Sequence, residues 1–165
     1  MKLPIVPVEQ IQMLPVMDRF TIAEEHIDIM GHMNVRWYLA FFDEAGWKFF
    51  QSFGMDDDYY RQNHTGGFAL QHFIHYLAEV RLGETVAIHC RMAARSAKRI
   101  HMMYFMINET TGKLAATLEG LGSHADLTVR RTSPYPPELA ARIDALIAEH
   151  DALGWDAPIS GAIQP

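Results

Sequence analysis

The stretch from Val35 to Phe53 constrains the fold of this chain more than any other segment. Asn34, which precedes it, is a favourable N-cap residue, so we expect a helix that begins at Val35. Its 19 residues would span roughly 28 Å at about 1.5 Å per residue. Aromatic and aliphatic side chains cover most of its circumference, and a helix without a polar face has to be enclosed by other structure.

The rest of the sequence supplies strands that can enclose this helix. Period-two patterning predicts five of them, over residues 18–27, 67–81, 84–95, 99–108 and 114–131. Gly83 and two short polar turns separate the last four, and short connections predict antiparallel neighbours. Pro137 suits the first turn of a C-terminal helix over 137–150. This order predicts an α+β fold in which a curved antiparallel sheet wraps a long central helix.

Composition narrows the class of protein further. A length of 165 residues predicts one domain over residues 1–165, and 49% hydrophobic with 21% charged residues is a globular composition. Cys90 is the only cysteine, which excludes a disulfide scaffold and fits a reducing compartment. The net charge of −6 argues against nucleic-acid binding. We find neither a signal peptide nor a run of about 20 apolar residues, so we expect a cytoplasmic protein without a membrane partner.

The residues before the predicted helix carry the chemistry. Asp28, His32 and Asn34 place a carboxylate, an imidazole and an amide within seven residues, and Gly31 permits a tight turn between them. The first amides of a helix lack intrahelical partners and can stabilise an oxyanion. A nearby aspartate could attack the carbonyl carbon or activate water. The alternative is structural: Asn34 caps the helix, Asp28 binds turn amides and His32 packs.

The pattern D-x-x-G-H-x-N-x-x-x-Y from Asp28 to Tyr38, followed by an aromatic-rich helix, resembles the hotdog-fold acyl thioesterases. The 4-hydroxybenzoyl-CoA thioesterase branch is the most similar, over roughly residues 18–137. The aspartate that opens its motif is catalytic and matches Asp28. The plant acyl-carrier-protein thioesterases have a similar motif, but their catalytic asparagine is replaced here by Met30.

The resemblance implies an acyl-CoA thioester hydrolase that uses no metal and no organic cofactor. Asp28 would be nucleophile or general base, His32 and Asn34 would orient the thioester or water, and amides near Met33 and Asn34 would polarise its carbonyl. Family members are homodimers or homotetramers with active sites at subunit interfaces. The residues expected to contact substrate are Gly31, Met33 and Tyr38, with Gly67 and Phe68 contributed by the neighbouring chain.

Coenzyme A carries phosphates, so we expect a basic cluster near the mouth of the site. Two groups of residues are candidates for binding it: Arg95, Lys98 and Arg99 at one turn, and Arg130 and Arg131 at the end of the last strand. Charged turn residues are also commonly just solvated. The segment from Glu79 to Glu84 and the Lys98–Arg99 pair resemble the betainyl-CoA thioesterases, and the aromatic residues could hold a quaternary ammonium group.

Several alternatives remain open from the sequence. His26, Asp28 and a distant histidine such as His101 or His124 could form a 2-His-1-carboxylate metal site. Asp43 or Glu44 could supply a catalytic carboxylate from the helix. An enoyl-CoA hydratase on the same fold would need a histidine five residues after the aspartate, whereas His32 lies four after Asp28. A non-catalytic acyl-binding module on this fold is the last alternative.

Overall fold

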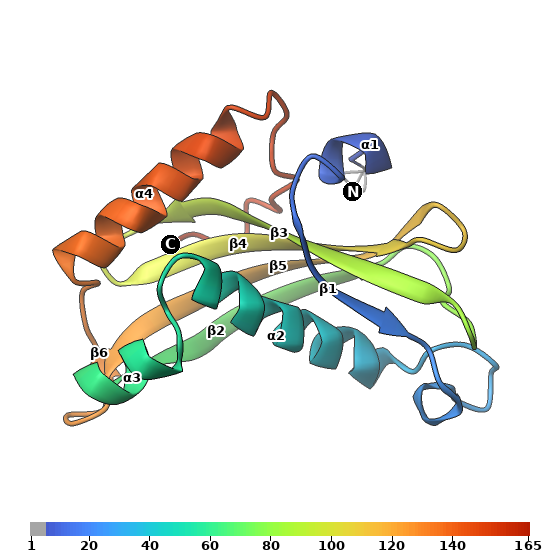
Figure 1. The fold of residues 1–165 in the computed structure, drawn as a ribbon, viewed down its shortest axis with the longest axis horizontal. Helices are drawn as coiled ribbons and strands as arrows, with labels where there is room; N and C mark the ends of the chain where they lie inside the picture. The colour runs from blue at the N-terminus through green and yellow to red at the C-terminus, as the bar shows by residue number, and fades with distance from the viewer. Residues whose placement is uncertain (1–5) are drawn as a thin grey trace. The chain divides into compact units, whose positions relative to one another are not determined.

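The computed structural model describes residues 6–165. Figure 1 shows its helices and strands. In chain order they are α1 (Val8–Ile11), β1 (Val16–Thr21), the 3₁₀ helix η1 (Glu24–His26), α2 (Val35–Ser52), α3 (Asp57–Asn63), β2 (Thr65–Tyr76), β3 (Thr85–Arg95), β4 (Arg99–Asn108), β5 (Lys113–Asp126), β6 (Arg131–Thr132) and α4 (Pro137–Asp151). The α+β class is confirmed. Within residues 6–165, no helix combines the length and the apolar character needed to cross a membrane.

The sheet has the order β1-β3-β4-β5-β2, and β6 pairs with the end of β5. The predicted hairpin around Gly83 is therefore wrong, because the strands on either side of it are not neighbours. β2 already ends at Tyr76, and the amides of Leu77 and Ala78 still donate to the carbonyl of Ala115 in β5. The chain must leave β5 before β3 begins at Thr85, so residues 77–84 form a crossing connection.

Other boundaries differ from the sequence expectation for local reasons. β1 ends at Thr21, because residues 24–26 turn into η1, where His26 Nδ1 accepts the amide of Ala23 at 3.0 Å. β5 stops at Asp126, whose Oδ1 accepts the amide of Thr128 at 2.7 Å and so closes a polar turn. The long helices α2 and α4 begin where the sequence places them.

The chain divides by its internal contacts into two compact units, and both α2 and the central strands run through both of them. Within the described residues, unit 1 comprises residues 6–48, 74–90 and 104–118, and unit 2 comprises residues 49–73, 91–103 and 119–165. That residues 1–165 form a single domain stays a prediction.

In unit 1, the apolar side chains of α2 pack against the sheet as the sequence predicts. Phe41 stacks on Phe20 of β1 with ring centroids 4.2 Å apart, and Phe42 lies 5.9 Å from Tyr104 of β4. Gly46 provides space for Tyr104, because a Cβ at that position would lie 3.1 Å from the tyrosine hydroxyl. Burial of these rings supplies the main favourable term for this helix.

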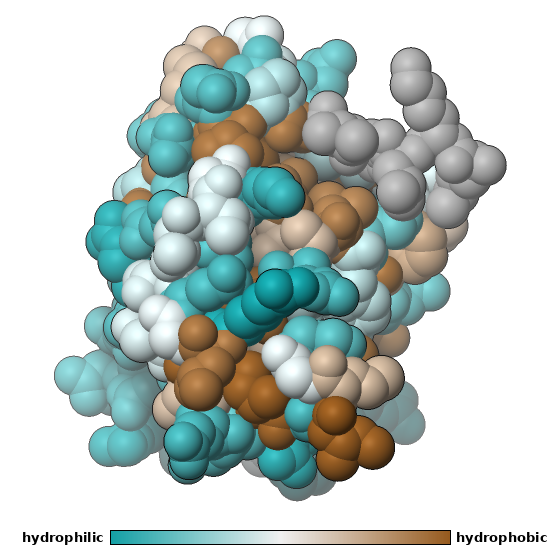
Figure 2. Space-filling model, turned by 90° about the vertical axis from the view of Figure 1, so that its right-hand side faces the viewer, coloured by the Kyte–Doolittle hydropathy of each residue, from teal (hydrophilic) through white to brown (hydrophobic). Residues whose placement is uncertain are grey.

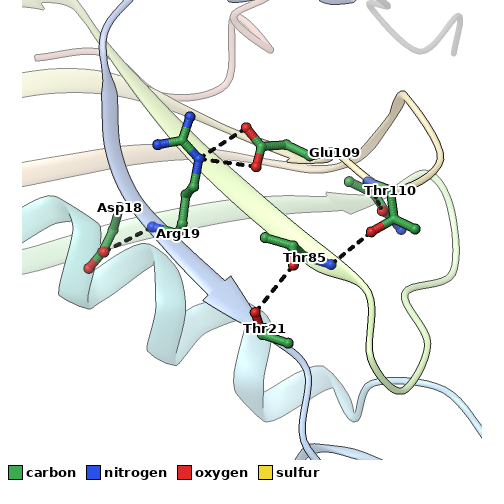
Figure 3. A network of polar contacts seen from close by, with 7 residues as sticks. Asp18, Arg19, Thr21, Thr85, Glu109 and Thr110 are labelled. Carbon is green, nitrogen blue, oxygen red and sulfur yellow. Dashed lines mark hydrogen bonds and ion pairs between the residues drawn. The ribbon is translucent and has the colours of Figure 1, made fainter.

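Polar contacts fasten the end of β1 in the same unit (Figure 3). Arg19 Nε donates to both carboxylate oxygens of Glu109, at 3.0 and 3.1 Å. The Thr21 and Thr85 hydroxyls lie 3.2 Å apart across β1 and β3, and Thr85 in turn donates its amide to the Thr110 hydroxyl at 3.0 Å. These contacts fix the segment that leads into the Asp28 loop.

In unit 2, α4 and the residues after it are held by buried polar groups of the sheet. His150 Nδ1 accepts the amide of Met92 at 2.9 Å. Arg91, 3% exposed, donates to the carbonyl of Trp155 at 2.6 Å, and its guanidinium lies 4.2 Å from the centroid of the indole ring. Glu119 accepts the amide of Ser160 at 2.8 Å. The C-terminal segment is thus an integral part of unit 2.

Candidate functional site

The residues from Ile27 to Asn34 form a closed loop in unit 1 that carries the predicted catalytic aspartate. Ile27 and Met33 form an isolated antiparallel bridge, and the amide of Asp28 donates to the carbonyl of His32 at 3.1 Å. Gly31 turns the chain with a φ of +81°, which favours glycine. The sequence prediction of a tight turn at Gly31 is confirmed.

Asp28 is half-buried at the base of this loop. Its Oδ1 accepts the amide of Met30 at 2.9 Å, and its Oδ2 lies 3.5 Å from Asn34 Nδ2. Asp28 and Asn34 are therefore neighbours in space, whereas the His32 ring is directed to the carbonyl of Met33 at 3.4 Å. The carboxylate is both oriented by the protein and partly accessible to solvent.

Asn34 caps α2 as its position predicts. Its side-chain oxygen accepts the amide of Arg36 at 3.2 Å, and its backbone carbonyl accepts the amide of Trp37 at 3.0 Å. Asn34 thus accepts hydrogen bonds from amides in the first turn of α2 and also contacts Asp28.

The backbone amides expected to polarise the thioester are engaged within unit 1. Met33 donates to the carbonyl of Val80 at 2.7 Å, and Asn34 donates to the carbonyl of His26 at 2.9 Å. Among the described residues, the Val35 amide, the first of α2, has no protein acceptor. The positive end of the helix therefore offers a donor one residue later than expected.

Residues 76–84, at the end of β2 and directly after it, form a wall beside this loop. Tyr38 of α2 is buried, and its ring meets that of Tyr76 edge to face with centroids 5.0 Å apart. Burial raises the pKa of Tyr38, and the neighbouring Tyr76 and Glu79 act in the same direction. The hydrogen bond from Arg81 lowers the pKa of the Glu79 carboxyl, with His32 contributing in the same direction.

The sequence does not indicate that Tyr76 and Glu79 lie in this region, although the segment from Glu79 to Glu84 resembles the betainyl-CoA thioesterases. The predicted strand over 67–81 contains both residues, whereas β2 ends at Tyr76 and Glu79 lies beyond it. The bond between Met33 and Val80 is what brings the segment to the Asp28 loop. No local signal in the sequence indicates a contact between residues so far apart.

Gly67 and Phe68 lie in unit 2, on β2, and both are exposed. β2 is the last strand in the sheet order, and residues 67–72 are exposed without interruption. A long, exposed edge strand is a template for pairing with another chain.

The basic residues expected to bind coenzyme A are all in unit 2 and fall into two kinds. Arg95 is bonded to Asp144, with Nε 2.6 Å from Oδ1. By contrast, no ion pair is found within residues 6–165 for the exposed residues Lys98, Arg99, Arg130 and Arg131.

His124 connects the two groups of unpaired cations. Its amide donates to the carbonyl of Lys98 at 2.8 Å, and its carbonyl accepts the amide of Ser133 at 3.0 Å. Arg131 lies next to this segment, because its backbone is opposite that of Asp126 where β6 pairs with β5. The turn before β4 and the turn after β5 are therefore neighbours, and Lys98, Arg99, Arg130 and Arg131 are exposed on them.

Apolar side chains are exposed around the Asp28 loop. Figure 2 shows brown, apolar surface gathered in the lower part of one face of the molecule. In unit 1, Ile29 is fully exposed, and the exposed set further includes Met30, Val35, Leu39, Tyr76 and Leu82. Large apolar side chains grouped in this way commonly mark an interaction surface.

In the part of the chain that the structure describes, no three His, Cys, Asp or Glu side chains are grouped so that they could hold a metal ion. His101 instead bonds Glu119 at 2.8 Å, and His124 bonds Tyr59 at 2.7 Å. Cys90 is fully buried, as expected for a structural thiol, and burial raises its pKa.

Comparison with known proteins agrees with the motif. A family model described as the Thioesterase-like superfamily matches residues 23–143. The chain is 26% identical to the betainyl-CoA thioesterase of Pseudomonas aeruginosa, over 80% of this chain and 83% of that protein. It is 31% identical to the L-carnitine dehydrogenase/betainyl-CoA thioesterase of Ruegeria pomeroyi, over 76% of this chain but only 25% of that longer protein.

Solved structures show the same fold. A hypothetical protein of Staphylococcus aureus, solved in complex with CoA, superposes with a TM-score of 0.81 at 22% identity, over 92% of this chain and 96% of that one. The 1,4-dihydroxy-2-naphthoyl-CoA thioesterase of Synechocystis superposes with a TM-score of 0.68 at 16% identity, over 78% and 95%.

The protein is a thioester hydrolase of the hotdog fold, in which an antiparallel sheet wraps a long central helix. It belongs to the Thioesterase-like superfamily. The predictions of fold and enzyme class are confirmed. The assignment of individual catalytic and binding residues stays a prediction.

Proposed function

We propose that the protein hydrolyses an acyl-CoA thioester with Asp28 as its catalytic carboxylate. The observation that carries the proposal is the arrangement of Asp28 and Asn34 at the first turn of α2, with their side chains 3.5 Å apart. A carboxylate that is oriented yet partly open to solvent can reach both a water molecule and a thioester carbon.

The reaction is an addition followed by an elimination. Oxygen from water, or from Asp28 itself, adds to the thioester carbon, and negative charge moves to the carbonyl oxygen. The Val35 amide at the start of α2 is the donor that would receive this oxygen, since the Met33 and Asn34 amides have protein acceptors. Collapse of the intermediate expels the thiolate of coenzyme A, which takes up the proton that Asp28 removed from water. Where Asp28 is the nucleophile, the collapse leaves a mixed anhydride on Asp28, and a water molecule then cleaves it to release the acid and the free carboxylate. Asn34 and His32 would orient water or thioester beside Asp28.

A second subunit would complete the site. Two features support a homodimer or homotetramer with shared active sites. The edge strand β2, which carries Gly67 and Phe68, is exposed, and so are the apolar residues around the Asp28 loop. The relative from Staphylococcus aureus was solved with CoA. In this chain Lys98, Arg99, Arg130 and Arg131 would bind the CoA phosphates. Arg95 takes no part, because Asp144 already occupies its guanidinium.

The names of the relatives favour a short acyl group. Betainyl-CoA, the substrate that those names state, is the one we propose for this chain. We place the reaction in the cytoplasm, where the single buried thiol of Cys90 would stay reduced.

A panel of acyl-CoA esters tests this function. Purified protein is incubated with betainyl-CoA and with neutral acyl-CoAs from short to medium length, and the release of free thiol is followed. We expect turnover of at least the short esters, with saturation. Binding of acyl-CoA without any thiol release would favour the non-catalytic binding module instead.

A further inference from the structure

We infer that Tyr76 and Glu79 form the acyl-group subsite and select a positively charged headgroup over a neutral one of the same shape. The inference deepens the proposed function and rests on it. It assigns the recognition of the substrate's cation to two side chains that the motif does not contain.

The subsite is placed by the backbone. The carbonyl of Val80 accepts the Met33 amide at 2.7 Å, so the segment from Tyr76 to Arg81 runs beside the loop that carries Asp28. Glu79 immediately precedes the bonded residue. All of these residues belong to unit 1.

An aromatic face is available there for a cation. The edge-to-face contact with the buried Tyr38 fixes the ring of Tyr76, with an interplanar angle of 82°. Tyr76 is also accessible, since 51% of the residue is exposed. The face of a tyrosine ring attracts a quaternary ammonium group, which has no N–H to donate and is poorly served by hydrogen-bond acceptors alone.

The local charge is also of the right sign. Glu79 and Glu84 add two carboxylates to that of Asp28, and Arg81 is the single formal cation in the segment from Tyr76 to Cys90. Arg81 pairs with Glu79 at 2.9 Å, while Glu84 accepts Asn108 Nδ2 at 2.7 Å and the Arg81 amide at 2.8 Å. The net negative charge of this wall favours a cationic acyl group and disfavours an anionic one.

A pair of isosteric substrates isolates this term. Betainyl-CoA and 3,3-dimethylbutyryl-CoA differ only in a quaternary nitrogen against a quaternary carbon, so their shapes are matched. The ammonium group also activates the thioester carbonyl, but this intrinsic effect is the same for every variant and cancels when variants are compared with wild type. The measured quantity is the ratio of kcat/KM for the cationic ester to that for the neutral ester. Wild-type protein is expected to favour betainyl-CoA, and the change in the ratio from wild type to each variant measures the contribution of the subsite.

Four variants separate the contributions. Tyr76→Leu removes the aromatic face, and we expect the ratio to fall about tenfold, whereas Tyr76→Phe retains the face and should keep it. Glu79→Gln should lower the ratio about fivefold, because it removes a carboxylate and releases Arg81. Glu24 of η1 is exposed and has no ion pair among residues 6–165. Glu24→Gln is therefore the matched control and should leave the ratio unchanged.

The outcomes distinguish this inference from the proposed function. Equal ratios in wild type, Tyr76→Leu and Glu79→Gln, with both esters hydrolysed, would overturn the subsite and leave the hydrolase intact. Hydrolysis of the neutral ester alone would likewise overturn the inference only. If the wild type hydrolysed neither of these esters but hydrolysed other acyl-CoAs, the inference alone would be overturned, whereas hydrolysis of no acyl-CoA would overturn both.

Discussion

Met33 donates its backbone amide to the carbonyl of Val80 at 2.7 Å, which fastens the loop that carries Asp28 to the segment that follows β2. The motif from Asp28 to Tyr38 is thereby joined to residues 76–84, which lie outside that motif. The bond also removes the Met33 amide from the set of groups that can polarise the substrate. The candidate active site is therefore defined by the position of the Asp28 loop as well as by the residues in it.

Asn34 has two roles that substitution can separate. Asn34→Ala loses both the cap on the Arg36 amide and the contact with Asp28, so we expect a loss of about 1 kcal/mol in the free energy of unfolding together with lower activity. Asn34→Ser retains a capping oxygen but is too short to reach Asp28. Its stability in urea should match wild type while kcat falls, and an unchanged kcat would contradict a role for Asn34 in orienting Asp28.

The basic residues of unit 2 predict a difference between its arginines. Arg130→Glu reverses an exposed, unpaired charge, so KM for acyl-CoA should rise several-fold at low salt with little change in kcat, and the effect should shrink as salt is added. Arg95→Gln breaks a bond to Asp144 and should leave KM unchanged. Equal KM values for Arg130→Glu and wild type would remove Arg130 from the coenzyme A site.

Three histidines predict how stability depends on pH. Burial lowers the pKa of His89, His124 and His150 from the ordinary value of 6.5. Below about pH 6.5 the unfolded chain therefore binds protons that the folded chain resists. The free energy of unfolding should be fully retained above pH 6.5 and should decrease steadily toward pH 5. Urea unfolding across this range checks the slope, and a rise in stability toward pH 5 would contradict it.

Arg91 anchors the C-terminal segment in unit 2. Arg91→Met removes the hydrogen bond from Arg91 to the Trp155 carbonyl and the cation from the indole face, so we expect a loss of about 2–4 kcal/mol in the free energy of unfolding. Limited proteolysis should then cleave after residue 151 sooner than in wild type. Wild-type stability and cleavage rates in this variant would show that the segment is held by other contacts.

The sequence predicted what depends on local pattern. The aromatic helix, its Asn34 cap and the turn at Gly31 follow from residue types and spacing, and the structure contains all three. The hairpin at Gly83 failed because a glycine between two apolar runs signals a turn without stating which strands become neighbours. The backbone bonds of Leu77 and Ala78 to β5 decide that, and they are contacts of long sequence separation.

The same limit applies to the site. Asp28, His32 and Asn34 could be found because they lie within seven residues. Tyr76 and Glu79 reach them only through the pairing of Val80 with Met33, and Arg95 is distinguished from Arg99 only by the position of Asp144 on α4.

Steady-state hydrolysis of acyl-CoA by Asp28→Asn tests the central claim most directly. Asp58→Asn on α3, an exposed carboxylate outside the site, is the matched control, and thermal unfolding verifies that both variants fold. We predict that kcat/KM falls at least about 100-fold in Asp28→Asn and stays at the wild-type value in Asp58→Asn. A folded Asp28→Asn protein that hydrolyses its substrate at the wild-type rate would contradict the assignment of Asp28 as the catalytic carboxylate.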